Sequence, residues 1–183
     1  MHALSQFSFN SIIKMDTSLD FSKKECCPVS HIRKHHEESV AFVVHRNKNK
    51  NVVVYSGNMI EGVLHTESPL NVNWIMFEQD GHPSEGLNMI ERNTAYGMTT
   101  KPMEGKEGHY HVTLTALKDR ILDLHVHSDG TVVGKANING QEDCIVERVF
   151  VQSKSSWGLP KVEYIEIHGK DTNGNSIMET KKP

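Results

Sequence analysis

The stretch "SVAFVVHRNKNKNVVVYS", residues 39–56, decides the fold class of this chain. Two runs rich in β-branched residues, 39–45 and 51–56, flank a short polar centre, as the strands of a hairpin flank a turn. The asparagines at the centre readily take the left-handed backbone conformation that tight turns need. The stretch therefore predicts a β-hairpin across Arg46 to Lys50.

The polar centre of this hairpin also carries positive charge. Arg46, Lys48 and Lys50 share the same parity, so they would project from one face if a strand continued through them. A second interpretation therefore stays open, in which Arg46 and Lys48 contact an anion or a phosphate group.

Strand-like runs recur along the rest of the chain, separated by turn-forming segments. They are residues 71–78, 109–117, 120–127, 131–138, 144–152 and 162–169. In residues 71–78 apolar side chains fall at both parities, which predicts a strand buried on both faces.

One segment, residues 84–96, changes this rhythm and predicts a single short helix. Three of its residues recur at helical spacing: Leu87, Ile90 and Thr94. Ser84 is placed to cap its first turn, and Gly97 to end it as a C-terminal glycine.

These signals together predict a mainly β fold: a single-domain antiparallel β-barrel or sandwich of 7–9 strands with that one helix. A doubly wound parallel sheet would need helical patterns between most strand pairs, and the sequence lacks them. We expect an N-terminal tail or an early helix within residues 1–37, the β-rich domain at 38–178, and a C-terminal tail at 179–183.

Length and composition limit the possible classes of protein. A chain of 183 residues fits one domain, and a net charge of −3 with a pI near 6.4 argues against nucleic-acid binding. Three cysteines, two of them adjacent at Cys26 and Cys27, make no disulfide framework. No segment approaches the roughly 20 apolar residues of a membrane span, and no secretory signal is evident. We therefore expect a soluble, cytoplasmic protein.

Histidine is unusually frequent, with twelve residues in the chain, and two H-x-H pairs fall on neighbouring predicted strands. His109 and His111 share one strand face, and His125 and His127 share another. Matching the apolar faces of the two strands leaves two registers: His111 opposite His127, or His111 opposite His125 with His109 opposite His127. Directly opposed residues have Cβ atoms about 4.5–5.5 Å apart, which lets imidazoles share a divalent ion such as zinc.

The alternative to this metal site is a solvated β face that happens to use histidine, which is the commoner case. Asp123 or Asp129 would add a carboxylate at one end of the cluster, and an open coordination position would permit water activation. Without a metal, opposed imidazoles would repel each other when protonated.

Other side chains that could bind a metal or act in catalysis lack the neighbouring residues that such a site would need. Cys26, Cys27, His31 and His35 are possible metal ligands, but their spacing matches no structural zinc pattern. Glu91 would suit a general base, yet no activated nucleophile lies near it, and an ion pair with a basic neighbour is its commoner role. The sequence has no G-x-S-x-G, no glycine-rich phosphate loop with its lysine, no H-E-x-x-H and no dinucleotide-binding fingerprint, which favours a protein that is not an enzyme.

The two tryptophans have different settings. Trp74 alternates with apolar residues and is predicted to lie in the core. Trp157, in the segment "SSWGLP", is predicted to lie in a loop, where an aromatic ring can close a cavity, contact a partner or simply fold back onto the surface.

Three segments, in order, resemble an uncharacterised family of small bacterial and protist domains. They are R-x-K-N-x-N-V-V-x-Y at residues 46–55, V-x-W-I-M at 72–76 and I-E-R-x-x-A-Y-G at 90–97. With the later "VFV…LPKVEYIEIHG", the resemblance covers roughly residues 40–175. It implies a β-rich domain and assigns no activity; members of the family often look exported in bacteria.

The best interpretation of function is a non-catalytic module that binds a small molecule, a lipid or a protein, since small β-barrels commonly enclose one ligand. Arg46, Lys48 and Trp157 are the candidate ligand contacts. A metal-binding protein or a metal-dependent hydrolase is the alternative, with these ligands: His109, His111, His125 and His127. A third hypothesis is an interaction protein that uses a sheet edge. The ligand and the oligomeric state stay open.

Overall fold

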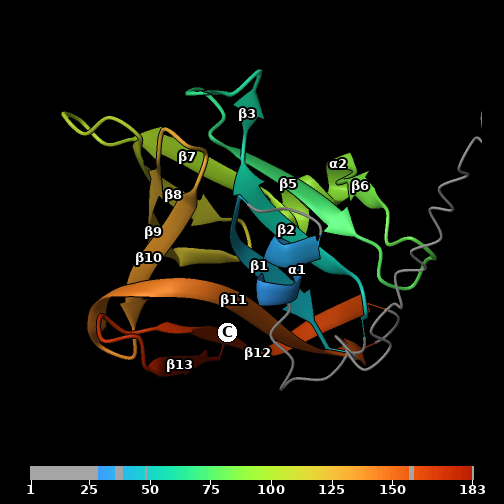
Figure 1. Ribbon diagram of the computed structural model, residues 1–183. Helices are drawn as coiled ribbons and strands as arrows, with labels where there is room; N and C mark the ends of the chain where they lie inside the picture. Colours follow the sequence, from blue (N-terminus) through green and yellow to red (C-terminus); the bar gives the residue numbers. More distant parts are fainter. Residues whose placement is uncertain (1–28, 36–38, 48, 157–158, 183) are drawn as a thin grey trace, which may run out of the picture.

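One large curled sheet, which forms a half-barrel, organises the protein (Figure 1). The computed structural model describes residues 29–35, 39–47, 49–156 and 159–182. Cys26, Cys27, Lys48 and Trp157 lie outside these residues.

The described chain contains thirteen strands and three short helical segments. In chain order they are α1 (Val29–His35), β1 (Val40–Arg46), β2 (Val52–Gly57), β3 (Met59–Ile60), β4 (Val63–Leu64), β5 (Leu70–Ile75), β6 (Ser84–Gly86), α2 (Met89–Glu91), the π-helical turn η1 (Arg92–Tyr96), β7 (Met98–Pro102), β8 (His109–Leu114), β9 (Leu117–Val126), β10 (Val132–Ile138), β11 (Gln141–Ser156), β12 (Leu159–Lys170) and β13 (Ser176–Lys181). No helix in this part of the chain is long and apolar enough to cross a membrane.

Eleven strands form the half-barrel, and the long strand β11 makes the sheet branch. The main path runs in the order β6-β5-β2-β1-β11-β10-β9-β8-β7, while β12 and β13 attach through β11. One edge of β11 pairs first with β10 and then with β1, and its other edge pairs with β12 over residues 145–156. The sheet therefore splits at β11, so its ends, β6 and β7, fall on separate arms.

The predicted mainly β fold is confirmed, but its details differ from the prediction. The hairpin across Arg46 to Lys50 is present, since β1 and β2 pair antiparallel. The described residues form thirteen strands, where 7–9 were expected. The sheet is an open half-barrel in which β1 and β11 run parallel, and not the wholly antiparallel barrel or sandwich that was predicted. This parallel pair joins segments about a hundred residues apart, and local strand patterns carry no information about such a pairing.

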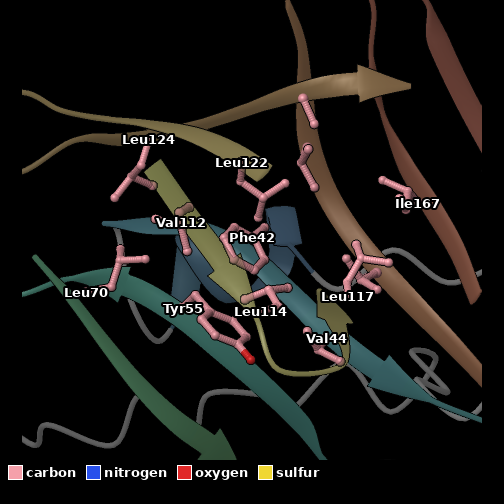
Figure 2. Packing of buried hydrophobic residues seen from close by; sticks show 14 of the residues in the cluster. Phe42, Val44, Tyr55, Leu70, Val112, Leu114, Leu117, Leu122, Leu124 and Ile167 are labelled. Atoms are coloured by element: carbon pink, nitrogen blue, oxygen red, sulfur yellow. The ribbon is translucent and has the colours of Figure 1, made fainter. Parts of the chain in front are cut away.

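The inner face of the half-barrel is filled by a packed hydrophobic core (Figure 2). Phe42 of β1 and Tyr55 of β2 stack at its centre, with ring centroids 4.5 Å apart and planes inclined by 18°. Leu122 and Leu124 of β9 and Ile167 of β12 are buried in the same cluster. Each such apolar side chain contributes about 1.5–3 kcal/mol on burial. Among the described residues, this face is therefore occupied by the protein's own apolar side chains.

The outer face of β1 and β2 is covered by α1, which lies against them in Figure 1. Val29 and Ile32 of the helix are buried against Val40 and Val43 of β1. The Arg33 guanidinium donates two hydrogen bonds to the Val40 carbonyl, at 3.0 and 2.7 Å, and fixes the end of the helix to the strand.

The helix predicted over residues 84–96 is much shorter than expected. Ser84 does not cap it, because residues 84–86 form β6 and pair with β5. Asn88 caps α2 instead: its side chain accepts the backbone N–H of Glu91, whose carboxylate accepts the N–H of Asn88 in return. This capping box satisfies two donors that would otherwise lack partners at the helix start.

Gly97 follows η1 in an extended conformation, with φ −68° and ψ 166°, and is not the left-handed C-terminal glycine that was predicted. A Cβ atom at this position would overlap the carbonyl oxygen of Arg92. The glycine is therefore required for the close approach of two backbone segments, not for its freedom at positive φ.

The strand predicted over residues 71–78 is also shorter, since β5 ends at Ile75. Its burial on both faces is incomplete: Trp74 is half-buried and packs at the margin of the core. The five later strands are confirmed as β8 to β12, with ends that differ by a few residues.

We expect Gly97→Ala to lower the free energy of unfolding by about 1–3 kcal/mol, because the new methyl group forces the Arg92 carbonyl to move. Gly86→Ala is the matched control, since a Cβ there meets no atom within 4 Å. Urea denaturation of both variants measures the effect. Equal stability of the two variants would show that the turn tolerates the methyl group.

Candidate functional site

Side chains from two distant segments of the chain, β5 and the continuous helical segment of α2 and η1, meet on the inner face of the sheet. The Trp74 indole N–H of β5 donates to the Glu91 carboxylate at the end of α2, at 3.2 Å. The same indole ring packs edge-on against Tyr96 of η1, with centroids 5.1 Å apart and planes at 76°. Glu91 thus forms a hydrogen bond with a tryptophan where an ion pair was expected.

Two further contacts fix Tyr96. The buried Tyr55 hydroxyl donates to its backbone carbonyl at 2.7 Å, which ties η1 to β2. Burial raises the pKa of the Tyr96 phenol, and a hydrogen bond and positive charge from Arg46 oppose that rise in part. Tyr96 therefore stays neutral at physiological pH and anchors η1 at both its backbone and its ring.

A cavity of about 470 Å³ lies beside this cluster. Its walls are formed by residues from the start of β5, from the segment 87–97 that contains α2 and η1, and from the start of β7. The cavity therefore lies between the arm of the sheet that ends in β6 and the arm that ends in β7. Its lining residues are Ser68, Leu70, Asn71, Val72, Asn73, Leu87, Arg92, Asn93, Tyr96, Gly97, Met98, Thr99 and Thr115. Several of the polar lining residues, among them Asn71 and Asn93, are exposed, so solvent reaches the cavity.

Among the described residues that line this cavity, Arg92 is the one cation. Its Nε atom donates to the carbonyl of Leu87 at 3.1 Å, which orients the guanidinium group from within the α2–η1 connection. Amide and hydroxyl groups make up most of the remaining polar lining, and Leu70, Val72 and Met98 supply apolar surface. The cavity therefore offers one positive charge, several hydrogen-bond donors and acceptors, and a small apolar wall.

Of the predicted ligand contacts, Arg46 lies among the described residues, outside the lining of this cavity. Arg46 is half-buried, and its Nε atom donates to the Ser153 hydroxyl at 3.1 Å. Its guanidinium also interacts with the Tyr96 phenol, and Arg46 is not among the described lining residues of the cavity. Lys48 and Trp157 lie outside the described residues, so an anion contact at Arg46 and Lys48 stays a prediction.

The histidines of β8 and β9 share a polar face, but in neither predicted register. His109 lies opposite His125, and His111 lies opposite Asp123. Only residues 115–116 separate the two strands, and the pairing shifts between Thr113 and Leu114. The turn therefore lies earlier in the chain than residues 118–119, where the predicted strands would place it. As a result, the pairing differs by two residues from the nearer predicted register, while the apolar faces still coincide.

Three of the four histidines form a continuous stack. The rings of His109 and His125 lie nearly parallel, with centroids 4.0 Å apart. The ring of His127 lies 3.9 Å from that of His125 and is tilted against it by 46°. His111 is separate, because its Nδ1 atom lies 2.7 Å from the Asp123 carboxylate. Burial first, and then the positive charges of His109 and His127, lower the pKa of His125.

A second cavity, of about 360 Å³, adjoins the stack and is lined by all three of its histidines together with Lys106, Lys135 and Asp143 among others. Within the described chain, no three His, Cys, Asp or Glu side chains converge as a bound ion would require. His31 of the predicted N-terminal metal group lies on α1, where its ring contacts Phe77 at a centroid distance of 6.2 Å.

The sequence matches one protein family over residues 42–180, a family described as a domain of unknown function (DUF4833). The chain belongs to this family. The match runs from β1 into β13, so the DUF4833 domain is the half-barrel itself, and the predicted resemblance to an uncharacterised family is confirmed. Neither curated proteins nor solved structures give a match to the chain.

The DUF4833 domain also buries a polar group that the sequence analysis missed. On the outer face, Arg148 of β11 and Glu166 of β12 are only 3% and 2% exposed. His168 lies 3.0 Å from the Glu166 carboxylate and 3.2 Å from the Arg148 guanidinium. The sequence does hold a signal for this group, because the charged residues Arg148 and Glu166 stand inside the otherwise apolar runs "CIVERVFVQ" and "VEYIEIHG". Charges buried in this way are held by their partners.

His45 of β1 is fully buried beside this group, with its ring edge-on to Phe150 at 5.5 Å. Its Nε2 atom faces the Asn49 carbonyl at 3.3 Å, whereas its Nδ1 atom has no hydrogen-bond partner among the described residues. Burial and the positive charge of Arg148 lower the pKa of His45 to about 4. The imidazole is therefore neutral at pH 7.

This lowered pKa predicts a loss of stability in mild acid. Between pH 6.5 and pH 4 the unfolded chain protonates His45 while the folded domain does not, so the folded state loses stability as the pH falls. We expect His45→Gln, which keeps a hydrogen-bond donor for Asn49 but cannot titrate, to remove about 2–3 kcal/mol of this loss at pH 4.5. Urea denaturation at pH 7 and pH 4.5 measures it; the same pH dependence in both proteins would contradict the assignment.

Proposed function

We propose that this DUF4833 domain binds a small polar molecule with a negative charge in the 470 Å³ cavity between the arms of the sheet, without catalysing a reaction. The single observation that carries the proposal is the lining of this cavity, in which one cation, Arg92, stands among amide and hydroxyl groups.

The size and chemistry of the cavity support a small organic ligand. Ligand cavities typically measure about 300–1,000 Å³ and combine an apolar wall with a few converging polar groups. Asn71, Asn73 and Asn93 each offer both a donor and an acceptor, which suits hydroxyl or carbonyl groups. The Arg92 guanidinium suits a carboxylate or a phosphate.

A lipid fits this site less well than a polar ligand does. A lipid carrier buries its ligand in an apolar interior, but the inner face of this half-barrel is filled by its own core. The remaining cavity has a polar lining, so an acyl chain would desolvate amides without hydrogen-bonding them.

The cluster beside the cavity explains how it keeps its shape without a ligand. Tyr55 holds the Tyr96 backbone, Trp74 holds Glu91, and the Gly97 carbonyl accepts the Thr115 N–H at 2.8 Å. The connection that carries Arg92 is thus attached to β2, β5 and the β8–β9 turn. A wall fixed in this way loses little conformational entropy when a ligand binds.

Binding can be tested by thermal-shift screening with small carboxylates, phosphate monoesters and sugar acids, followed by calorimetry on any compound that stabilises the protein. We expect Arg92→Ala to weaken binding of such a compound about tenfold or more, because it removes a charge-assisted hydrogen bond worth about 1.5–3 kcal/mol. Asn93→Asp should weaken binding in the same direction, because it adds a negative charge to the lining.

Lys118→Ala is the matched control, since this exposed cation does not line the cavity. It should bind the compound as the wild type does. The proposal fails if no compound of these classes stabilises the protein, or if Arg92→Ala and Lys118→Ala bind the compound equally well.

A further inference from the structure

We propose that His109, His125 and His127 bind a divalent transition-metal ion at the edge of the 360 Å³ cavity, and that His111 is not one of its ligands. The site lies on β8, on β9 and at the residue directly after β9, and it is separate from the cavity next to η1.

The pairing of the two strands creates this group of three. His109 lies directly opposite His125, and His127 follows His125 at the next position on the same face of the chain. His125 is therefore central and contacts both other rings, at centroid distances of 4.0 and 3.9 Å. Three imidazoles fixed by one hairpin need no rearrangement of the backbone to act together.

The contacts of His111 separate it from the others. It faces Asp123 in the register, and the two side chains form a pair at 2.7 Å. Its neighbour on the other side is Lys101 of β7. The structure thus selects three of the four histidines that the sequence offered.

In their present orientations the three rings do not form a metal site, since no three His, Cys, Asp or Glu side chains of the described residues are placed to hold one ion. With zinc–nitrogen bonds of about 2.0–2.1 Å, two imidazoles on one tetrahedral ion have ring centroids about 5 Å apart. The observed 4.0 and 3.9 Å require each outer ring to move outward by about 1 Å, with the nitrogens turned to a common point. His109 and His125 are only half-buried and His127 is exposed, so side-chain rotation supplies this movement on a fast timescale.

The surroundings leave room for the remaining ligands of such an ion. The adjoining cavity admits water, which completes the coordination of a three-histidine site. Asp143 also lines the cavity, 4.0 Å from the Lys135 ammonium, and its carboxylate lowers the cost of a positive ion there. A ligand set made of imidazoles suits Zn²⁺, Ni²⁺ and Cu²⁺ and does not suit Mg²⁺ or Ca²⁺.

The test uses the full chain without an affinity tag, titrated with ZnCl₂ and NiCl₂ by isothermal calorimetry. The histidine side-chain signals are followed by NMR in the same titrations. A Cys26→Ser/Cys27→Ser background excludes metal held by the N-terminal cysteines. His125→Phe removes the central ligand but keeps an aromatic ring in the stack, and His111→Ala is the matched control.

We expect one Ni²⁺ or Zn²⁺ per chain in the Cys26→Ser/Cys27→Ser background, with the signals of His109, His125 and His127 shifted or broadened. His125→Phe should weaken this binding at least tenfold, whereas His111→Ala should leave it within a factor of two. Three results would overturn the proposal. The first is a loss of metal binding in the Cys26→Ser/Cys27→Ser protein itself. The others are equal affinity with and without His125→Phe in that background, and a loss of affinity in His111→Ala equal to that in His125→Phe. NMR on the unmutated chain keeps the test valid if His125→Phe does not fold.

Discussion

The rest of the candidate site depends on one buried hydrogen bond, from the Tyr55 hydroxyl to the Tyr96 carbonyl. The Tyr55 ring that makes it is itself stacked on Phe42 in the core. The segment that connects β6 to β7 crosses between the two arms of an open sheet, and its helical turns are too short to be stable alone. It takes its position from the sheet beneath it. The wall that carries Arg92, and with it the shape of the cavity, follows from that position.

The branching at β11 explains why the domain has such a cavity. Because β1 and β10 share one edge of β11, the strands beyond them diverge, and the half-barrel stays open between β5 and β7. Apolar side chains fill the inner face, so the polar side chains of the candidate sites lie in the gap between the arms and on the outer face of the sheet. The ligand cavity, the histidine stack and the buried Arg148–Glu166 group therefore occupy three separate places on one core.

Local patterns in the sequence predicted those features of the fold that depend only on residues close together in the chain. The asparagine-rich hairpin, the alternation of His109 to Leu114 and the strands of the C-terminal half all follow from period two and turn chemistry. Pairings between distant segments did not follow, as the parallel β1–β11 contact shows. The histidine register was missed because a two-residue turn with a shift in pairing sets it, and strand alternation is the same for registers two residues apart. The cavity was missed because its walls come from segments that only the tertiary fold brings together.

Hydrogen–deuterium exchange of the wild type and Tyr55→Phe tests most directly whether this one contact holds the wall of the cavity. The account predicts that amides of residues 87–97 exchange about tenfold faster in the variant, the effect of losing one buried hydrogen bond of about 1–2 kcal/mol. Amides in β11 and β12 should be unchanged between the two proteins. Unchanged exchange in residues 87–97, or an equal increase across the whole domain, would contradict the account.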